Sequence, residues 1–231
     1  MISSTEKIIL NVRAVIFDMD GVITNTMPDH FHAWKSVLND EGISVTQHDV
    51  YSREGQRGIT SLQEIFATYQ RPYHQDRASA ILKKKEELFK QIVRQRFISG
   101  SRTFLKSLKR SGFVLALVTG TSRHELHRIL PDDIFKLFNV VVTGSDVVNG
   151  KPDPEPYRLA LAKLRLNPSH AVVIENAPLG IKSAKAAGLR CLALETSLPQ
   201  PYLKSADAIF TSIRDLREQV IFVMAPSAAD Q

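Results

Sequence analysis

Residues 14–21 read AVIFDMDG, four apolar residues followed at once by two aspartates with a methionine between them, and then a glycine. The apolar run does not alternate with polar residues, so it predicts a strand that is buried on both faces of a parallel sheet. Further runs of the same kind occupy 113–118, 140–142, 171–174, 191–194 and 208–210. The repetition predicts a doubly wound α/β fold, provided that helices separate the runs.

Helical patterns do separate them. Apolar residues recur at three- and four-residue spacing over 101–111, 122–130, 155–166 and 179–187. The alternation breaks once, before residue 101, where three helical patterns (29–40, 60–69 and 75–93) follow one another with little strand pattern between them. Such a stretch is far too long for a loop. We therefore predict a helical cap domain, residues 25–95, inserted into an α/β core formed by residues 1–24 and 96–231.

The composition is typical of a globular protein of one or two domains: 231 residues, 43% hydrophobic and 23% charged. No apolar run approaches the ~20 residues that cross a bilayer. A single cysteine, Cys191, excludes an intrachain disulfide. These features predict a cytoplasmic protein that does not act at a membrane.

The net charge of +6 favours anionic ligands without identifying them. The densest basic run, Lys83 to Lys85, is followed by Glu86 and Glu87, a pattern typical of a solvated helix face. We therefore expect no nucleic-acid partner. A monomer or a weak homo-oligomer is expected.

Polar residues follow three of the predicted strands and precede one of the predicted helices. They are, in chain order, Asp18 and Asp20, Thr119 to Thr121, Lys151, and Glu175 with Asn176. Because the carboxyl ends of parallel strands meet at one edge of the sheet, these side chains are expected to face one crevice.

Three carboxylates in one crevice repel one another, and one lysine cannot neutralise them. A divalent cation resolves this conflict, and oxygen ligands favour Mg²⁺, which commonly binds one or two carboxylates together with a substrate phosphate. The hydroxyls of Thr119 and Thr121, the backbone at Gly120 and the charge of Lys151 suit a phosphoryl group. The residues thus predict a magnesium-dependent phosphoryl site.

Four segments in this order resemble the four motifs of the haloacid dehalogenase-like (HAD) superfamily, and the predicted helical domain resembles its cap. The segments are DMDGVITNT (18–26), VTGTS (118–122), GKPDPEPY (150–157) and VVIENAPLGIKSAKAAG (172–188). The chain is most similar to the β-phosphoglucomutase-like phosphatase and mutase group. Members of that group share a His, an Ala and a Trp near the first cap helix, here His30, Ala33 and Trp34.

The resemblance implies a role for each residue of the crevice. Asp18 would be the nucleophile that forms an aspartyl-phosphate, and Asp20 the general acid and base. The phosphoryl group would be bound by Thr119, Gly120, Thr121 and Lys151. Mg²⁺ would be held by Asp18, the backbone carbonyl of Asp20, and Glu175 or Asn176. Many family members carry Asp in place of Asn176, and a neutral amide binds the ion less strongly, so Glu175 is the preferred ligand of that pair.

Two cap residues are candidates for substrate contact. His30 lies one helical turn before Trp34, and the competing interpretation is a buried histidine beside a tryptophan of the cap core. Arg57, in the glycine-bearing segment 52–58, has a planar guanidinium that suits a phosphate or carboxylate. Lys85 could serve likewise, but a solvated lysine is expected there.

The main functional hypothesis is a Mg²⁺-dependent phosphatase acting on a small phosphorylated metabolite, such as a sugar phosphate, with the cap excluding water. One alternative is a phosphosugar mutase of the β-phosphoglucomutase type, which must also grip a second phosphate. Another is a non-catalytic phosphoacceptor, because receiver domains also place a phosphorylatable Asp on a parallel sheet. Such domains have no cap and need no acid two residues after the nucleophile.

Overall fold

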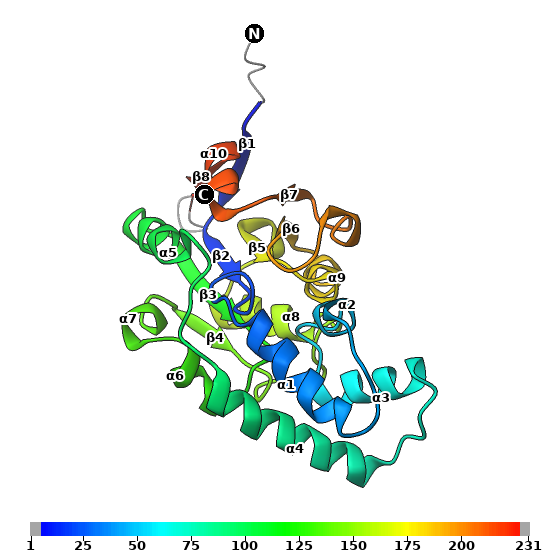
Figure 1. Ribbon diagram of the computed structural model, residues 1–231. Helices are drawn as coiled ribbons and strands as arrows, with labels where there is room; N and C mark the ends of the chain where they lie inside the picture. Colours follow the sequence, from blue (N-terminus) through cyan, green and yellow to red (C-terminus); the bar gives the residue numbers. More distant parts are fainter. Residues whose placement is uncertain (1–5, 227–231) are drawn as a thin grey trace.

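The computed structural model describes residues 6–226, so the ends of the predicted core, 1–5 and 227–231, lie outside the described residues. Figure 1 shows a sheet with helices on both faces and a second group of helices beside it. The sheet has six parallel strands in the order β4-β3-β2-β5-β6-β7. The strands are β2 (Ala14–Phe17), β3 (Val114–Val118), β4 (Val140–Val142), β5 (Ala171–Glu175), β6 (Arg190–Leu194) and β7 (Ala208–Phe210). The doubly wound α/β prediction is confirmed.

Strand β2 lies in the middle of the sheet, hydrogen-bonded to β3 and to β5. All four of its residues are buried. Val15 and Phe17 belong to one apolar cluster, whereas Ala14 and Ile16 belong to another. Because an apolar cluster covers each face, this strand needs no polar residue, and its central place puts residues 18–21 in the middle of the sheet's carboxyl edge.

The helices of the core alternate with these strands. They are α5 (Ser101–Arg110), α6 (Leu126–Ile129), α7 (Asp132–Phe135), α8 (Glu155–Leu164), α9 (Pro178–Ala186) and α10 (Ile213–Gln219). Short 3₁₀ segments occupy Arg123–Glu125, Pro168–His170 and Gln200–Tyr202. The helix predicted over 122–130 is thus divided into a 3₁₀ turn and a single α-helical turn.

Four helices lie between β2 and α5: α1 (Met27–Asn39), α2 (Gln47–Tyr51), α3 (Gly58–Thr68) and α4 (Gln75–Ile92). They pack around a third apolar cluster that contains Trp34, Leu38 and Leu62, and which Leu198 of the core also joins. A separate cluster is what an inserted domain needs, and it places Trp34 in the cap core. The short helix α2, which begins with a Thr46–Asp49 capping box, was not predicted.

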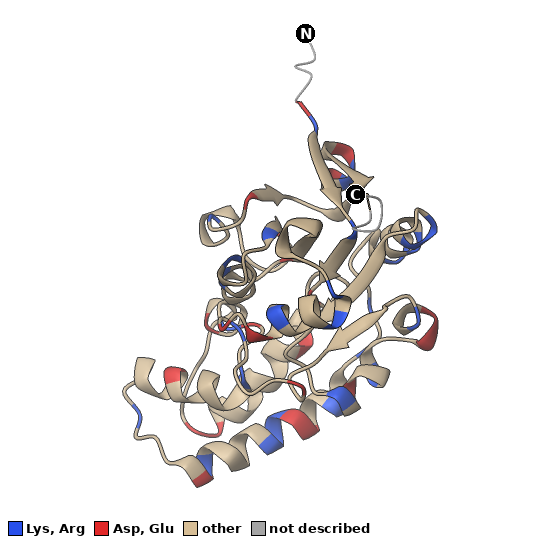
Figure 2. Ribbon diagram, turned by 180° about the vertical axis from the view of Figure 1, so that it is seen from behind, with Lys and Arg blue, Asp and Glu red and all other residues tan. Residues whose placement is uncertain are grey.

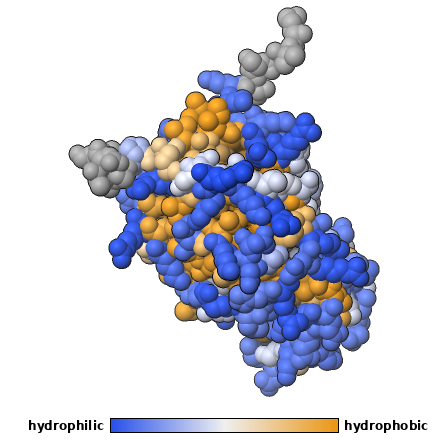
Figure 3. All heavy atoms as spheres, turned by 90° about the vertical axis from the view of Figure 1, so that its left-hand side faces the viewer, coloured by the Kyte–Doolittle hydropathy of each residue, from blue (hydrophilic) through white to orange (hydrophobic). Residues whose placement is uncertain are grey.

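A second, two-stranded parallel sheet joins β1 (Ile8–Val12) and β8 (Val220–Met224). Neither strand was predicted from sequence, because each is stabilised by a partner at the far end of the chain. Leu10 and Val12 point into the core, whereas Ile9 and Ile221 are exposed. Figure 3 shows apolar atoms at the surface near the N-terminal end of the described chain.

Among the described helices, none has both the length and the apolarity that a bilayer crossing requires. Figure 2 shows basic and acidic residues interspersed along the long helix α4 rather than gathered by sign.

Candidate active site

The fold brings the residues predicted for the crevice together. Asp18 follows β2, Thr119 follows β3 and Glu175 ends β5, and these three strands are neighbours in the sheet. Lys151 comes from the loop before α8. All four side chains are buried, none more than 4% exposed. Their charges therefore interact with little screening by water.

Lys151 links two of the carboxylates. Its Nζ donates to Asp18 Oδ1 at 2.6 Å and to Glu175 Oε1 at 2.7 Å, and the Val118 carbonyl lies at 3.3 Å. Burial disfavours the charged amine, but the carboxylates of Asp18 and Glu175 outweigh this effect and raise the pKa of Lys151. Lys151 is therefore a fixed positive charge beside Asp18.

Both oxygens of Glu175 are engaged by donors of the protein. Besides Lys151, Oε1 accepts from the Tyr157 hydroxyl at 2.9 Å, and Oε2 accepts from the backbone N–H groups of Asn176 at 2.9 Å and Ala177 at 3.1 Å. Gly180 makes room for the carboxylate, since a Cβ there would lie 1.7 Å from Oε1. Tyr157 lies within the GKPDPEPY segment, but sequence analysis did not single it out.

Two buried oxygens near this network have no hydrogen-bond partner among the described residues, Asp18 Oδ2 and Asn176 Oδ1. Asn176 Nδ2 donates to Ser197 Oγ at 2.7 Å, which leaves the amide oxygen free. Buried oxygens without a partner are costly, and hard oxygen ligands suit Mg²⁺. These two oxygen atoms therefore fit a divalent cation. They favour Asn176 over Glu175 as a ligand, the reverse of the preference drawn from sequence.

The environment of Asp18 supports the same conclusion. Burial raises the pKa of Asp18 well above its ordinary value, and although Lys151 opposes this, the carboxylates of Glu175 and Asp20 add to it. A bound cation has the opposite effect, because it stabilises the ionised carboxylate. Asp18 thus lies where a cation would favour its ionised form.

Asp20 connects the core to the cap. Its Oδ1 accepts from the Thr26 hydroxyl, its Oδ2 accepts from Thr121 Oγ1 at 3.2 Å, and His30 Nε2 lies 3.5 Å from Oδ1. Burial alone would raise the pKa of Asp20, but the nearby His30 and the hydroxyls of Thr26 and Thr121 lower it below its ordinary value. Thr119 Oγ1 lies 3.5 Å from Oδ2 of the same carboxylate.

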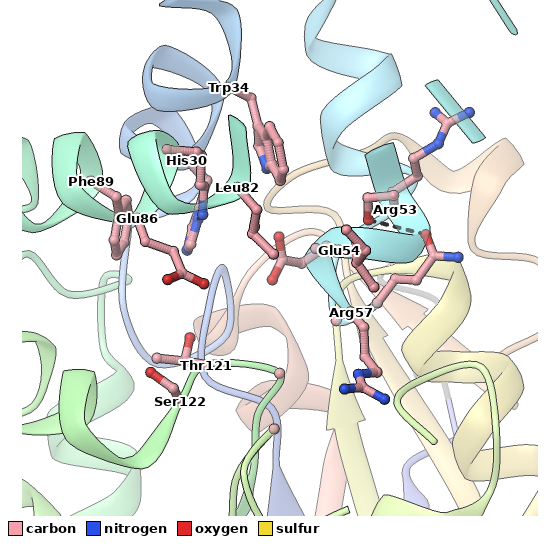
Figure 4. Close-up of a pocket in the computed structure, with 18 of the residues that line it drawn as sticks. His30, Trp34, Arg53, Glu54, Arg57, Leu82, Glu86, Phe89, Thr121 and Ser122 are labelled. Atoms are coloured by element: carbon pink, nitrogen blue, oxygen red, sulfur yellow. Dashed lines mark hydrogen bonds between the residues drawn. The ribbon is translucent and has the colours of Figure 1, made fainter. Parts of the chain in front are cut away.

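A cavity of about 440 Å³ lies between the cap and the carboxyl ends of the strands. Figure 4 shows that its wall combines cap and core side chains, among them His30, Trp34, Glu54, Phe89, Thr121 and Ser122. The cap thus covers the site, and a small molecule reaching Asp20 would be enclosed by residues of both parts.

The structure corrects the expectation for Lys85. This residue is 8% exposed rather than solvated, and its Nζ lies 3.1 Å from His30 Nδ1. It lies at helical spacing from Ala78, Ile81 and Phe89, the buried face of α4. That spacing was visible in the sequence, but the basic run around Lys85 masked it. The His30 ring stacks on Phe89, with the ring centroids 4.0 Å apart.

Arg57 lines the cavity but is exposed, and its Nη1 donates to the Val148 carbonyl of the core at 2.7 Å. Figure 4 shows its guanidinium directed away from His30. The neighbouring Glu54, which sequence analysis did not consider, points into the cavity instead. Asp20, His30 and Glu54 each offer a polar atom, and these atoms lie within 4.8 Å of one another. Only the conformation of the loop decides which of its side chains points inward.

Comparison with known proteins identifies the family. Residues 15–194 match the sequence profile of the haloacid dehalogenase-like hydrolases, which is well over half of the chain. The chain belongs to this family. The phosphorylated carbohydrates phosphatase of Thermotoga maritima is 34% identical to this HAD hydrolase over 188 residues, 77% of this chain and 82% of the relative. The β-phosphoglucomutase of Bacillus subtilis is 29% identical over 219 residues, 91% of this chain and 94% of the relative.

The fold supports the same grouping. A solved structure described as a putative β-phosphoglucomutase from Bacteroides vulgatus superposes with a TM-score of 0.80 at 31% identity, covering 90% of this chain and 87% of the other. These likenesses confirm the predicted superfamily and its β-phosphoglucomutase-like group. This HAD hydrolase is accordingly a phosphohydrolase.

Proposed function

We propose that this HAD hydrolase is a Mg²⁺-dependent phosphatase that hydrolyses small phosphomonoesters, such as sugar phosphates, through an aspartyl-phosphate. One observation carries the proposal: buried Asp18 has one oxygen held by Lys151 and the other without a partner among the described residues, and Asp20, two residues later, accepts from Thr121, which lines the cap cavity. The phosphorylated carbohydrates phosphatase of Thermotoga maritima is named for substrates of this class.

The first chemical step forms the covalent intermediate. A carboxylate oxygen of Asp18 attacks phosphorus and the ester P–O bond breaks. Asp20, which must first bind a proton because its lowered pKa favours the carboxylate, gives that proton to the departing alkoxide oxygen. In the second step, Asp20 takes a proton from water, the water oxygen attacks phosphorus, and the bond from Asp18 to phosphorus breaks. Inorganic phosphate leaves and both carboxylates return to their starting state.

The remaining residues stabilise charge during these steps. Lys151 compensates the negative charge of the transferring group, and Thr119, Thr121 and the backbone at Gly120 donate hydrogen bonds to its oxygens. Asp18, Asn176 and the backbone carbonyl of Asp20 would hold Mg²⁺. When bound, the ion neutralises negative charge on the carboxylate and the phosphoryl group.

A mutase of the β-phosphoglucomutase type is the second candidate, because the relative from Bacillus subtilis matches over nearly its whole length. Interconversion of hexose 1- and 6-phosphates, primed by a bisphosphate, would establish it. The non-catalytic phosphoacceptor is not supported, since the family and its named relatives are enzymes.

The test is phosphate release from a panel of phosphorylated metabolites and from p-nitrophenyl phosphate, with and without Mg²⁺. We expect turnover that EDTA abolishes and Mg²⁺ restores. Asp18→Asn should reduce it about a thousandfold or more, because the nucleophile is lost. Asp40→Asn, at an exposed aspartate of the cap, is the matched control and should retain wild-type turnover. Full turnover in Asp18→Asn would refute the nucleophile assignment.

A further inference from the structure

The group formed by Asp20, His30 and Glu54 has a feature that the proposed hydrolysis does not use. His30 is 9% exposed, and its Nε2 has no hydrogen-bond partner among the described residues although it faces Asp20 Oδ1 at 3.5 Å. Figure 4 shows the Glu54 carboxylate pointing into the cavity toward the side on which His30 and Thr121 lie. A buried polar nitrogen and a carboxylate thus face the same small volume.

The contact with Lys85 fixes what His30 offers there. Lys85 Nζ lies 3.1 Å from His30 Nδ1, and an ammonium group can only donate hydrogen bonds. Nδ1 is therefore the acceptor, and the neutral ring carries its hydrogen on Nε2. A protonated nitrogen has no lone pair for a metal ion, so this group is unsuited to bind one through His30. It presents one donor, Nε2–H, beside one acceptor, the Glu54 carboxylate.

A hydroxyl group matches this pair, because it can accept from Nε2–H and donate to the carboxylate at the same time. The location of the pair indicates which hydroxyl. In the proposed reaction Asp20 protonates the leaving oxygen, so the ester carbon lies beside Asp20. The polar atoms of Asp20 and Glu54 lie within 4.8 Å of each other. Two oxygens on adjacent carbons in a gauche arrangement lie closer together than this, so the ester oxygen can contact Asp20 while the adjacent hydroxyl contacts Glu54.

We propose that His30 and Glu54 form a specificity pair that binds a hydroxyl on the carbon next to the phosphoester carbon, and that Glu54 excludes substrates carrying an anionic group there. The inference rests on the proposed phosphatase function and narrows its substrate class to phosphoesters of polyols. A carboxylate or second phosphate at that place would meet the charge of Glu54 and would leave the Glu54 oxygens without a donor.

Three phosphoesters that differ only at the adjacent carbon test the proposal. In 2-hydroxyethyl phosphate this carbon bears a hydroxyl, in ethyl phosphate it is a methyl group, and in 2-phosphoglycolate it is a carboxylate. We compare kcat/KM for the three at pH 8, where the carboxylate of 2-phosphoglycolate is ionised. The enzymes are the wild type, Glu54→Gln and Glu54→Ala, with Glu86→Gln as a matched control at another carboxylate that lines the cavity.

The wild type should prefer the hydroxyethyl ester over the ethyl ester by about tenfold or more, the value of one charge-assisted hydrogen bond. The kcat/KM of the wild type for phosphoglycolate should be lower than that for the ethyl ester. In Glu54→Ala the hydroxyethyl and ethyl esters should have similar kcat/KM. In Glu54→Gln the kcat/KM for phosphoglycolate, relative to that for the hydroxyethyl ester, should rise about tenfold. Glu86→Gln should keep the wild-type ratios. Circular dichroism and thermal unfolding check that each variant is folded.

Equal kcat/KM for all three esters in the wild type would overturn the proposal, as would wild-type ratios in folded Glu54→Ala. If the wild type hydrolyses neither these esters nor p-nitrophenyl phosphate, the phosphatase function itself has failed. If the wild type hydrolyses p-nitrophenyl phosphate but shows the same kcat/KM for all three esters, only the specificity pair is overturned and the phosphatase function stands.

Discussion

At the scale of single residues, the balance of charge around Asp18 depends on Asn176. Its amide oxygen is buried without a partner, while its amide nitrogen donates to Ser197. The uncharged amide limits how many anionic groups surround the proposed Mg²⁺. An aspartate at this position would add a charge and strengthen the site for the ion, at the cost of the hydrogen bond donated to Ser197.

We therefore expect Asn176→Asp to lower the Mg²⁺ concentration for half-maximal activity, by about fivefold to tenfold if one added carboxylate strengthens the site. Without Mg²⁺ the same variant should unfold at lower urea than the wild type, because a further carboxylate is buried near Asp18 and Glu175. Added Mg²⁺ should remove that difference. A half-saturating concentration at or above the wild-type value would show that residue 176 is not a ligand.

Tyr157 is a positioning residue, since its hydroxyl contacts Glu175 and not the phosphoryl site. Tyr157→Phe removes this donor but keeps the ring, over which Lys151 Nζ lies 5.2 Å from the centroid. We expect a loss of about 1 kcal/mol in unfolding free energy. A severalfold fall in kcat with little change in KM should accompany it, because Lys151 is held less rigidly. Urea unfolding and steady-state kinetics measure the two effects, and unchanged kcat would exclude the positioning role.

The sequence predicted the residues of the core site better than those of the cap. Asp18, Thr119 and Glu175 lie at the carboxyl ends of neighbouring buried strands, and Lys151 lies in the loop before α8, so the topology of the fold brings them together. Glu54 points into the cavity because of the conformation of its loop, and no pattern in the local sequence predicts that conformation.

At the scale of elements, strands with two buried faces were predictable because their composition reflects their burial. Strands β1 and β8 were not predictable, since each depends on a partner at the other end of the chain. Helix α2, with five residues, was too short to show a hydrophobic period.

The turn after β4 carries a pH-dependent prediction. Asp146 Oδ2 accepts from the backbone N–H of Thr143 at 2.8 Å and from its hydroxyl at 2.6 Å, and Arg123 pairs with the same carboxylate. Burial opposes ionisation, but these donors lower the pKa of Asp146 below its ordinary value. Because the folded-state pKa is the lower one, the stabilisation is present above the unfolded-state pKa and is lost as the pH falls through the folded-state pKa.

Asp146→Asn should therefore reduce the free energy of unfolding by about 1 kcal/mol at pH 7, where the carboxylate is ionised. The difference between the variant and the wild type should shrink as the pH falls from 4 toward 2. Urea unfolding across this range is the measurement. A difference that is independent of pH would mean that the ionised carboxylate does not stabilise the turn.

At the scale of the whole molecule, the cap and core meet in a closed arrangement. The backbone of Gly55 in the cap lies close to Gly120 of the core. A Cβ added at residue 120 would lie 3.1 Å from the Gly55 carbonyl oxygen. Arg57 adds a hydrogen bond from the cap to the Val148 carbonyl. Sequence analysis predicted that the cap excludes water from the site but not which residues of the two domains meet, because a contact between two surfaces leaves no periodic pattern in the sequence.

Arg57→Ala should weaken closure rather than one substrate contact. We expect kcat/KM to fall by about the same factor, roughly twofold to tenfold for one exposed hydrogen bond, across phosphoesters of different structure. Arg57→Lys, which keeps a donor and the charge, is the control and should recover part of the loss. A loss confined to substrates with a second anionic group would instead support direct substrate contact by Arg57.

The pairing of β1 with β8 has a consequence for how the protein is made. During translation β1 leaves the ribosome before every other described strand, whereas β8 follows all of them, so the edge of β1 that pairs with β8 stays open until β8 has emerged. An unpaired strand edge can recruit another chain. The nascent polypeptide is thus exposed to intermolecular association through β1 for as long as β8 is unmade, and a chaperone bound to the nascent chain would protect it during that interval.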